Sequence, residues 1–310
     1  MRVFYPQSIV ACLLVAAFTG CSIERVAMNR LADSLANTGT VFAADNDPEL
    51  VRDAAPFSLK LMETVLESTP DHDGLLLALA SGFTQYGYAF VQQDAERVEL
   101  QDFEGAEAMK ARAAKLYRRA RDYGLRALDA RHAGWSQQVR QSPVAAAKRC
   151  EKADVPALYW TSAAWGALIS LSKDKPEVVA DLPQVAALAD RALALDADYG
   201  QGALHSFMIT FTLARADLSS DPKAIAKKHF DRAVELSGGQ NASPFIDWVE
   251  AVSVQEQNAD EFSRLLNQAL AIDLNARPEW TLANTVLQRR ARWLLKRKDD
   301  LILPPLPPLE

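Results

Sequence analysis

The sequence contains little of the chemistry on which enzymes and metal proteins usually depend. Its 310 residues include three cysteines and four histidines, and the histidines are spread along the chain as His72, His132, His205 and His229. The sequence also lacks the short motifs of serine hydrolases, phosphate-binding loops, zinc peptidases and thiol redox sites. We therefore expect no catalytic residues, no metal and no cofactor, and the sequence indicates a binding protein.

Positive charge is also scarce, because 34 basic residues stand against 40 acidic ones and the net charge is −6. A protein that binds nucleic acid needs a basic surface for the phosphates, so we expect no nucleic-acid partner. The exception is the segment 105–130, which carries Lys110, Arg112, Lys115, Arg118, Arg119, Arg121 and Arg126. This segment is either a solvated helix face or a contact for an acidic partner or for lipid headgroups.

The N-terminus predicts a lipoprotein signal peptide. Arg2 supplies a positive charge, and the apolar run of residues 9–18 is too short to span a bilayer, for which about 20 residues are needed. Small residues then lead to Cys21 in a pattern that resembles a bacterial lipobox, although Phe18 stands where an aliphatic residue is usual. The alternative is an ordinary secretory signal in which the cysteine is incidental.

These features divide the chain into four predicted segments. Residues 1–20 are a signal peptide, 21–46 a lipidated N-terminus and tether, 47–300 a helical domain and 301–310 a proline-rich tail. We predict lipidation at Cys21 and a periplasmic location, with the lipid as the membrane anchor. Because Ser22 rather than an aspartate follows the cysteine, the lipobox resemblance points to the outer membrane.

From Asp47 onward the sequence predicts an all-α fold. Asp47-Pro48-Glu49 and Asp221-Pro222 place a capping acid before a proline in the first helical turn, and Ser243-Pro244 repeats the pattern. Apolar residues recur at spacings of three and four, and no segment alternates with period two beside a hairpin signal. We expect about ten helices, near 49–68, 73–93, 105–130, 155–173, 177–195, 200–216, 222–237, 244–257, 259–272 and 279–298.

The expected helices also repeat. Similar strings end three successive hairpins, namely RALAL at 191–195, RAVEL at 232–236 and QALAI at 268–272. Near the front of the domain, Val65 and Pro70 occupy positions where a tetratricopeptide repeat places a small residue and a proline. A strict repeat recurs every ~34 residues, so these units are degenerate. The sequence predicts a tetratricopeptide-like helical solenoid, in which each hairpin buries its apolar face on its neighbour.

Two features look like chemistry but have plainer explanations. Residues 71–74 (DHDG) begin like a calcium loop, yet the later acidic ligands are missing, so we expect Asp71 or Asp73 to cap a helix. Cys150 has no disulfide partner once Cys21 carries lipid, and we interpret it as a partly buried free thiol.

A set of aromatic residues is the best candidate for a ligand groove or channel. Its members, on three expected helices, are Phe83, Tyr86, Phe90, Tyr159, Trp160, Trp165, His205 and Phe211. The inner surface of a solenoid is concave, and amphipathic aromatic side chains there often line a binding site. The alternative is ordinary core packing.

Several strings in the sequence resemble the TatT family, the T components associated with tripartite ATP-independent periplasmic (TRAP) transporters. The strings are LYWTSAAWG at 158–166, DYGLRAL at 122–128, GALH at 202–205, RAVELSGG at 232–239 and RRARWLL at 289–295. The resemblance extends over about residues 25–298, which is nearly the whole chain beyond the signal.

The resemblance implies a function. Members of this family are periplasmic lipoproteins with a helical, tetratricopeptide-like fold and no catalytic residues. They associate with the transporter's periplasmic solute-binding protein, are thought to form trimers, and offer a channel for an apolar or organic-acid ligand. The alternative is a scaffold lipoprotein of outer-membrane assembly, which would hold envelope proteins on the same concave surface.

Overall fold

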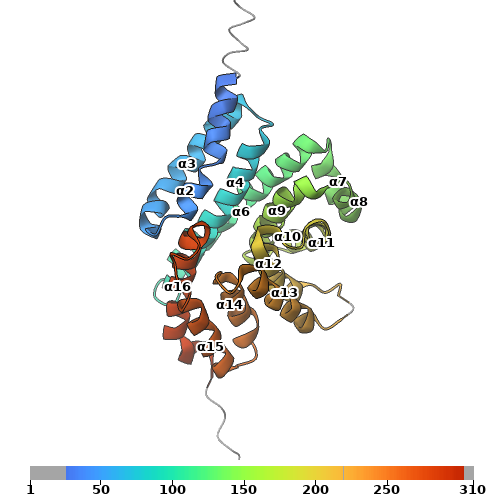
Figure 1. The fold of residues 1–310 in the computed structure, drawn as a ribbon. Helices are drawn as coiled ribbons and strands as arrows, with labels where there is room; N and C mark the ends of the chain where they lie inside the picture. The colour runs from blue at the N-terminus through green and yellow to red at the C-terminus, as the bar shows by residue number, and fades with distance from the viewer. Residues whose placement is uncertain (1–25, 219, 304–310) are drawn as a thin grey trace, which may run out of the picture.

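The structure is a computed structural model that describes residues 26–218 and 220–303 (Figure 1). Within these ranges the regular elements are helices and none is a strand, which confirms the predicted all-α class. The predicted signal peptide, the lipidation site at Cys21 and the proline-rich tail from residue 304 lie outside the described residues.

The helices follow the chain in close succession. The first part contains a helix over 26–36, then α2 (Gly39–Ala43), α3 (Pro48–Ser68), α4 (Asp73–Tyr86), α5 (Gln93–Val98) and α6 (Phe103–Arg131). The middle contains α7 (Trp135–Gln141), α8 (Pro143–Lys148), α9 (Val155–Ser170), α10 (Pro176–Val179), α11 (Leu182–Leu195) and α12 (Ala203–Ala214). The last part contains α13 (Pro222–Ser237), α14 (Ser243–Trp248), α15 (Ala259–Leu270), α16 (Thr281–Lys296) and α17 (Lys298–Leu301).

Side-chain caps begin several of these helices, as two of the sequence signals predict. The Asp47 carboxylate accepts hydrogen bonds from the backbone N–H groups of Glu49 and Leu50, both at 3.1 Å, at the start of α3. Asp221 does the same for α13 by accepting from the Lys223 N–H at 3.0 Å. These bonds satisfy donors that the first turn of a helix leaves without an intrahelical partner.

Other predicted helix starts differ in the structure. His72, rather than Asp71 or Asp73, caps α4, because its Nδ1 atom accepts a hydrogen bond from the Leu75 N–H at 3.2 Å. Ser243 makes no side-chain cap on α14. Instead, Asn284 of α16 accepts a bond from the Ala242 N–H at 2.9 Å, so a distant helix satisfies this donor.

Some expected segments are divided or longer than the periodicity indicated. The expected helix 177–195 breaks before Leu182, since Pro183 begins a new first turn there. The connection 131–153 contains α7 and α8, which bury Trp135 and Val139. The expected tether includes the helix 26–36, whose Ala32 is fully buried against the core.

Two helices contain a turn of π-helix. Residues Gly87–Gln92 join α4 to α5, and Val249–Ser253 extend α14. A π turn inserts a residue into the regular ladder and rotates the side chains that follow, and it is often found at functional sites. Hydrophobic periodicity does not reveal such an insertion, so the expected helices 73–93 and 244–257 did not include it.

Successive helices pack on one another, and the two ends of the chain meet. Figure 1 shows the blue helices α2 and α3 beside the red helix α16. Val51 of α3, Phe90 of the first π turn and Val286 of α16 form a small buried cluster at this junction. The stacking of neighbouring helices is what a helical repeat requires, and here the path also brings its first and last elements together.

Helix α9 lies at the centre of the larger core and is packed on nearly all sides. It contacts α4, α6 and α11. At its crossing with α6, a Cβ atom added to Gly124 would lie 2.1 Å from Thr161 Oγ1 and 3.3 Å from Thr161 Cα. Only glycine fits this crossing, which joins the strings 122–128 and 158–166.

One helix among the described residues, Asp73–Val98, is long and apolar enough to cross a membrane by length and composition alone. Half of its most apolar window is buried inside the protein, as in the core helix of a soluble protein. This helix includes α4, the first π turn and α5.

We predict that Gly124→Ala destabilises the protein. The new methyl group would push α6 from α9, and overpacking of this kind typically costs about 1–3 kcal/mol, more than the gain of about 1 kcal/mol from replacing a helical glycine. Gly39→Ala is the matched control, because nothing lies within 4 Å of its added Cβ atom. Urea unfolding of both variants checks this, and equal midpoints would contradict the close crossing.

Candidate functional site

A buried ion-pair network connects α5 and the second π turn to the last long helix, α16. Arg290 of α16 is only 7% exposed and pairs with Glu96 of α5 at 2.5 Å and with Glu250 of the second π turn. Its pKa is raised above the ordinary arginine value, since the charges of Glu250 and Glu96 outweigh the opposing effect of burial. Arg290 therefore stays charged and holds three elements together.

Two more titratable groups, Asp247 and Tyr88, lie around this network. Burial raises the pKa of Asp247 well above its usual range, and the charge of Glu250 adds to the shift. Burial also raises the pKa of Glu250 itself, despite the hydrogen bond from Arg290. The pKa of Tyr88 is raised by burial and then by Glu250. We call Tyr88, Glu96, Asp247, Glu250 and Arg290 the inner cluster.

The inner cluster is acidic and incompletely neutralised. The cluster contains one guanidinium, which pairs with Glu96 and Glu250, and a third carboxyl group, Asp247; Asp247 and Glu250 keep part of their surface open to solvent. Carboxyl groups with raised pKa values can hold a proton and donate a hydrogen bond near neutral pH. Such groups could bind a polar ligand group in either protonation state.

A row of aromatic side chains lies beside the inner cluster. Tyr159 is its centre, with ring centroids 4.8 Å from Trp160, 5.3 Å from Tyr199 and 6.5 Å from Phe207. Phe207 in turn stacks on Phe211 at 5.3 Å. Helix α12, which carries Phe207 and Phe211, packs on α14, which carries Asp247. Asp247 also contributes to the raised pKa of Tyr159, after burial and Tyr199. We call the five aromatic residues Tyr159, Trp160, Tyr199, Phe207 and Phe211 the aromatic row.

The structure brings together only part of the predicted aromatic set. Tyr159, Trp160 and Phe211 belong to the aromatic row. Tyr86 and Phe90 form a separate pair at 5.6 Å. Phe83, Trp165 and His205 belong to other contacts.

Phe83 and Trp165 are core residues. Phe83 is 4% exposed and stacks on Tyr123 at 6.1 Å. Trp165 is fully buried, and its Nε1–H donates a hydrogen bond to Asp181 at 3.0 Å. Both side chains are thus committed to packing between helices.

His205 pairs with a second histidine. Its Nδ1 lies 2.8 Å from Nδ1 of His229 on α13, so one ring donates and the other accepts. Burial, followed by the influence of His205, lowers the pKa of His229 to about 4. The pKa of His205 is lowered as well, mainly by burial. Both rings are therefore neutral near pH 7.

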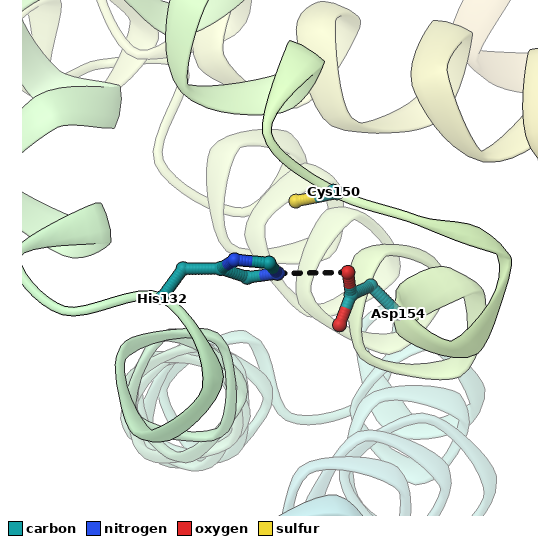
Figure 2. A group of neighbouring side chains, drawn as sticks. All are labelled: His132, Cys150 and Asp154. Atoms are coloured by element: carbon teal, nitrogen blue, oxygen red, sulfur yellow. Dashed lines mark hydrogen bonds and ion pairs between the residues drawn. The ribbon is translucent and has the colours of Figure 1, made fainter.

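Cys150 lies in a compact group with His132 and Asp154 (Figure 2), and their ligand-type atoms are all within 4.8 Å of one another. The Asp154 carboxylate already accepts from the Glu151 N–H and pairs with His132 at 2.8 Å and Arg131 at 2.8 Å. Burial, aided by the charge of Asp154, raises the pKa of the Cys150 thiol to about 11.

This arrangement favours a structural tie over a metal site. The raised pKa means that a metal ion would have to displace the thiol proton in order to bind, which weakens binding at neutral pH. Arg131 already compensates the carboxylate, and Arg149 and Arg191 add positive charge around the sulfur. The prediction of a partly buried free thiol understated its burial, since Cys150 is fully buried.

Sequence reasoning missed most of the inner cluster, although one signal was present. Arg290 lies three residues after Leu287 and four before Leu294, on the apolar face of its helix. A charge on such a face requires a buried partner. Tyr88 and Glu250 gave no comparable signal, because the π turns set their directions.

The fold and the site define an all-helical protein with a charged, aromatic-flanked interior. The chain belongs to the family of TRAP transporter T-components (TAtT), which it matches over residues 44–302. It is also similar to an uncharacterized protein of Treponema pallidum (strain Nichols), with 28% identity over 311 residues, covering 94% of this chain and 95% of the relative. Family membership implies an accessory role in TRAP transport and a periplasmic or membrane-associated location.

We predict that Arg290→Met lowers the free energy of unfolding by about 2–3 kcal/mol, somewhat below the loss for a fully buried pair, because it leaves Glu96 and Glu250 without their cation. Adding Glu250→Gln should restore part of the loss. Arg232→Met is the matched control: Arg232 also pairs with two acids, Asp198 and Glu235, but on the surface, where about 0–1 kcal/mol is expected. Equal losses in urea unfolding would refute the distinction.

The histidine pair predicts a pH dependence. An unfolded histidine titrates near pH 6.5, whereas folded His229 titrates at about 4, so the unfolded state binds more protons between these values. Stability from this pair is complete above pH 6.5 and is lost as the pH falls towards 4. His229→Gln should therefore lose less stability than the parent between pH 7 and 5, by about 1 kcal/mol. Parallel pH dependences would contradict the assignment.

Proposed function

We propose that this protein is a lipid-anchored periplasmic accessory component of a TRAP transport system, which binds the solute-binding protein and an apolar or organic-acid ligand. The family match over residues 44–302 is the observation on which the proposal rests. Lipid anchoring at Cys21, attachment to the outer membrane and assembly as a trimer remain predictions from the sequence.

The ligand-binding site that we propose, called the ligand seat below, consists of the aromatic row and the inner cluster. Binding sites for small molecules are mostly apolar and contain a few polar groups that fix orientation. Tyr159, Trp160 and Phe207 are half-buried and offer apolar surface, and Asp247 and Glu250 offer carboxyl groups. A ligand with an apolar body and a hydrogen-bonding end matches this combination.

The contact surface that we propose for the solute-binding protein is one face of α3. Leu50, Phe57 and Leu61 recur there at spacings of seven and four, and Phe57 is 74% exposed. Val51, Leu59 and Met62 on other faces of the same helix are buried. An exposed apolar stripe on a helix often marks a protein contact, and the family role supplies the solute-binding protein as its occupant.

Retention of the partner tests this surface. The purified protein is immobilised and exposed to the purified solute-binding protein of the same organism's TRAP system. Phe57→Ser should weaken retention about tenfold or more, as loss of a central apolar contact does. Phe103→Ser is the matched control, since Phe103 is also exposed, at 63%, but lies on α6.

Two results would refute the docking proposal. The first is absence of retention by the unaltered protein, particularly if it captures envelope-assembly proteins instead, which would favour the scaffold alternative. The second is a loss of self-association in Phe57→Ser with unchanged partner retention, which sedimentation would reveal. In that case the α3 face is a contact between copies.

The ligand seat is tested separately with a neutral apolar fluorophore, N-phenyl-1-naphthylamine. Saturable fluorescence enhancement is expected with the unaltered protein, and Trp160→Ala should weaken it several-fold because a large apolar contact is removed. Trp280→Ala is the matched control: Trp280 is also half-buried, but it lies against Arg277, with the guanidinium 4.4 Å from the ring centroid. Equal effects of the two substitutions would exclude the aromatic row as the seat.

A further inference from the structure

A basic pocket lies beside the ion-pair network of Arg290, whose guanidinium is 4.4 Å from the ring centroid of the pocket residue Trp293. It encloses about 400 Å³ where α3, α5 and α16 meet. Its cationic lining consists of Arg52, Arg97, Arg289, Arg292 and Lys296, to which Asp94 and Trp293 are added. We call this set the basic pocket. Its size is that of a small-molecule site.

The positive charge of the basic pocket is only partly compensated. Its five cations face two carboxylates: Asp94 is shared between Arg52 and Arg97, and Glu49 is shared between Arg52 and Arg289. Burial, followed by the positive charge of Arg289, lowers the pKa of Arg97 below the ordinary arginine value. Such a concentration of positive charge is unexpected on a chain whose net charge is −6.

Several donors of the basic pocket have no acceptor among the residues that the structure describes. Arg289 uses Nη1 to pair with Glu49 at 2.5 Å, but its Nε and Nη2 atoms are buried without a hydrogen-bond partner. Buried donors of this kind are costly unless something satisfies them. Arg292 and Lys296 are exposed, and neither has an ion-pair partner within the described ranges.

The free donors have the geometry that oxyanions require. Nε and Nη2 form one edge of a guanidinium, and such an edge binds a carboxylate or phosphate through two parallel hydrogen bonds. Arg289 lines the pocket while its Nη1 pairs with Glu49, so this edge is left for another acceptor. Arg292 and Lys296 lie three and seven residues further along α16, so they add a second cationic centre on the same helix face.

We propose that the basic pocket is a binding site for a small anion that carries at least two carboxylate or phosphate groups. One oxyanion group pairs with Arg289 and Arg97, and the other with Arg292 and Lys296. This site is distinct from the aromatic row and the inner cluster, whose carboxylates would repel such a ligand. The proposal does not depend on the TRAP function.

Occupancy would also tie two distant parts of the chain to each other. Arg97 comes from α5 and Arg289 from α16, so an anion between them adds a contact beside the junction of Val51, Phe90 and Val286. A ligand that binds only the folded state stabilises it in proportion to the logarithm of its concentration. The melting temperature is therefore a second readout beside direct binding.

Calorimetric titration of the purified full-length protein with citrate and with pyrophosphate, at low ionic strength, tests the proposal. Saturable binding of at least one anion is expected, with glycerol as the neutral control. The double variant Arg292→Gln/Lys296→Gln should weaken binding about tenfold or more, since two charge-assisted contacts are lost. These side chains are exposed, so the variant should fold like the parent.

The matched control is Lys228→Gln/Arg264→Gln, which removes two exposed cations from α13 and α15 and changes the net charge equally. It should weaken binding less than about twofold, because exposed charges far from the ligand are screened. Equal weakening by both double variants would overturn the proposal, as would the absence of saturable binding. Binding to phosphatidylglycerol vesicles through Arg292 and Lys296, without binding of either free anion, would also overturn it.

Discussion

The buried guanidinium of Arg290 joins parts of the chain that are far apart in sequence. It pairs with Glu96 of α5, the helix that follows the first π turn, and with Glu250 in the second π turn. Transfer of a charge from water to the protein interior has a large desolvation penalty, and only well-placed ion pairs and hydrogen bonds offset it. Because the partners come from different thirds of the chain, the pairing is available only when the helices follow their native path. The network thereby favours the native arrangement of the helices over alternative, less tightly packed arrangements.

The tight crossing of α6 and α9 also fixes how the helices of this fold pack. Gly124 lets the two backbones approach, and the buried Thr161 satisfies its hydroxyl by donating to the Ala157 carbonyl at 2.6 Å. A larger residue at position 124 would tilt α9 and with it Tyr159 and Trp160. The position of the aromatic row therefore depends on a glycine on a different helix. The strings 122–128 and 158–166, which resemble the family, meet at this crossing, and the close contact of Gly124 with Thr161 gives a physical reason for both.

The sequence predicted what depends on local patterns and missed what depends on long-range geometry. The all-α class followed from periodicity, and the starts of α3 and α13 followed from Asp47 and Asp221, whose caps involve neighbouring residues. The π turns were missed because one extra residue in a hydrogen-bonded ladder leaves the apolar pattern almost unchanged. The basic pocket was missed for a different reason. Arg52 and Arg289 are more than two hundred residues apart, and no pattern in the sequence indicates that they meet.

Helix α16 borders two environments of opposite charge. These environments adjoin each other: Arg290 pairs with the carboxylates of the inner cluster and lies against Trp293, while Arg289 and Arg292 line the basic pocket. Adjacent helical positions differ by about 100°, so consecutive arginines necessarily serve different faces. The acidic side has raised carboxyl pKa values and adjoins aromatic surface, so it suits a ligand with an apolar body and a hydrogen-bonding end. The basic side suits a multivalent anion. One helix with the string RRARW can thus support two chemically distinct sites, and a change at Arg290 would disturb both by moving the helix that they share.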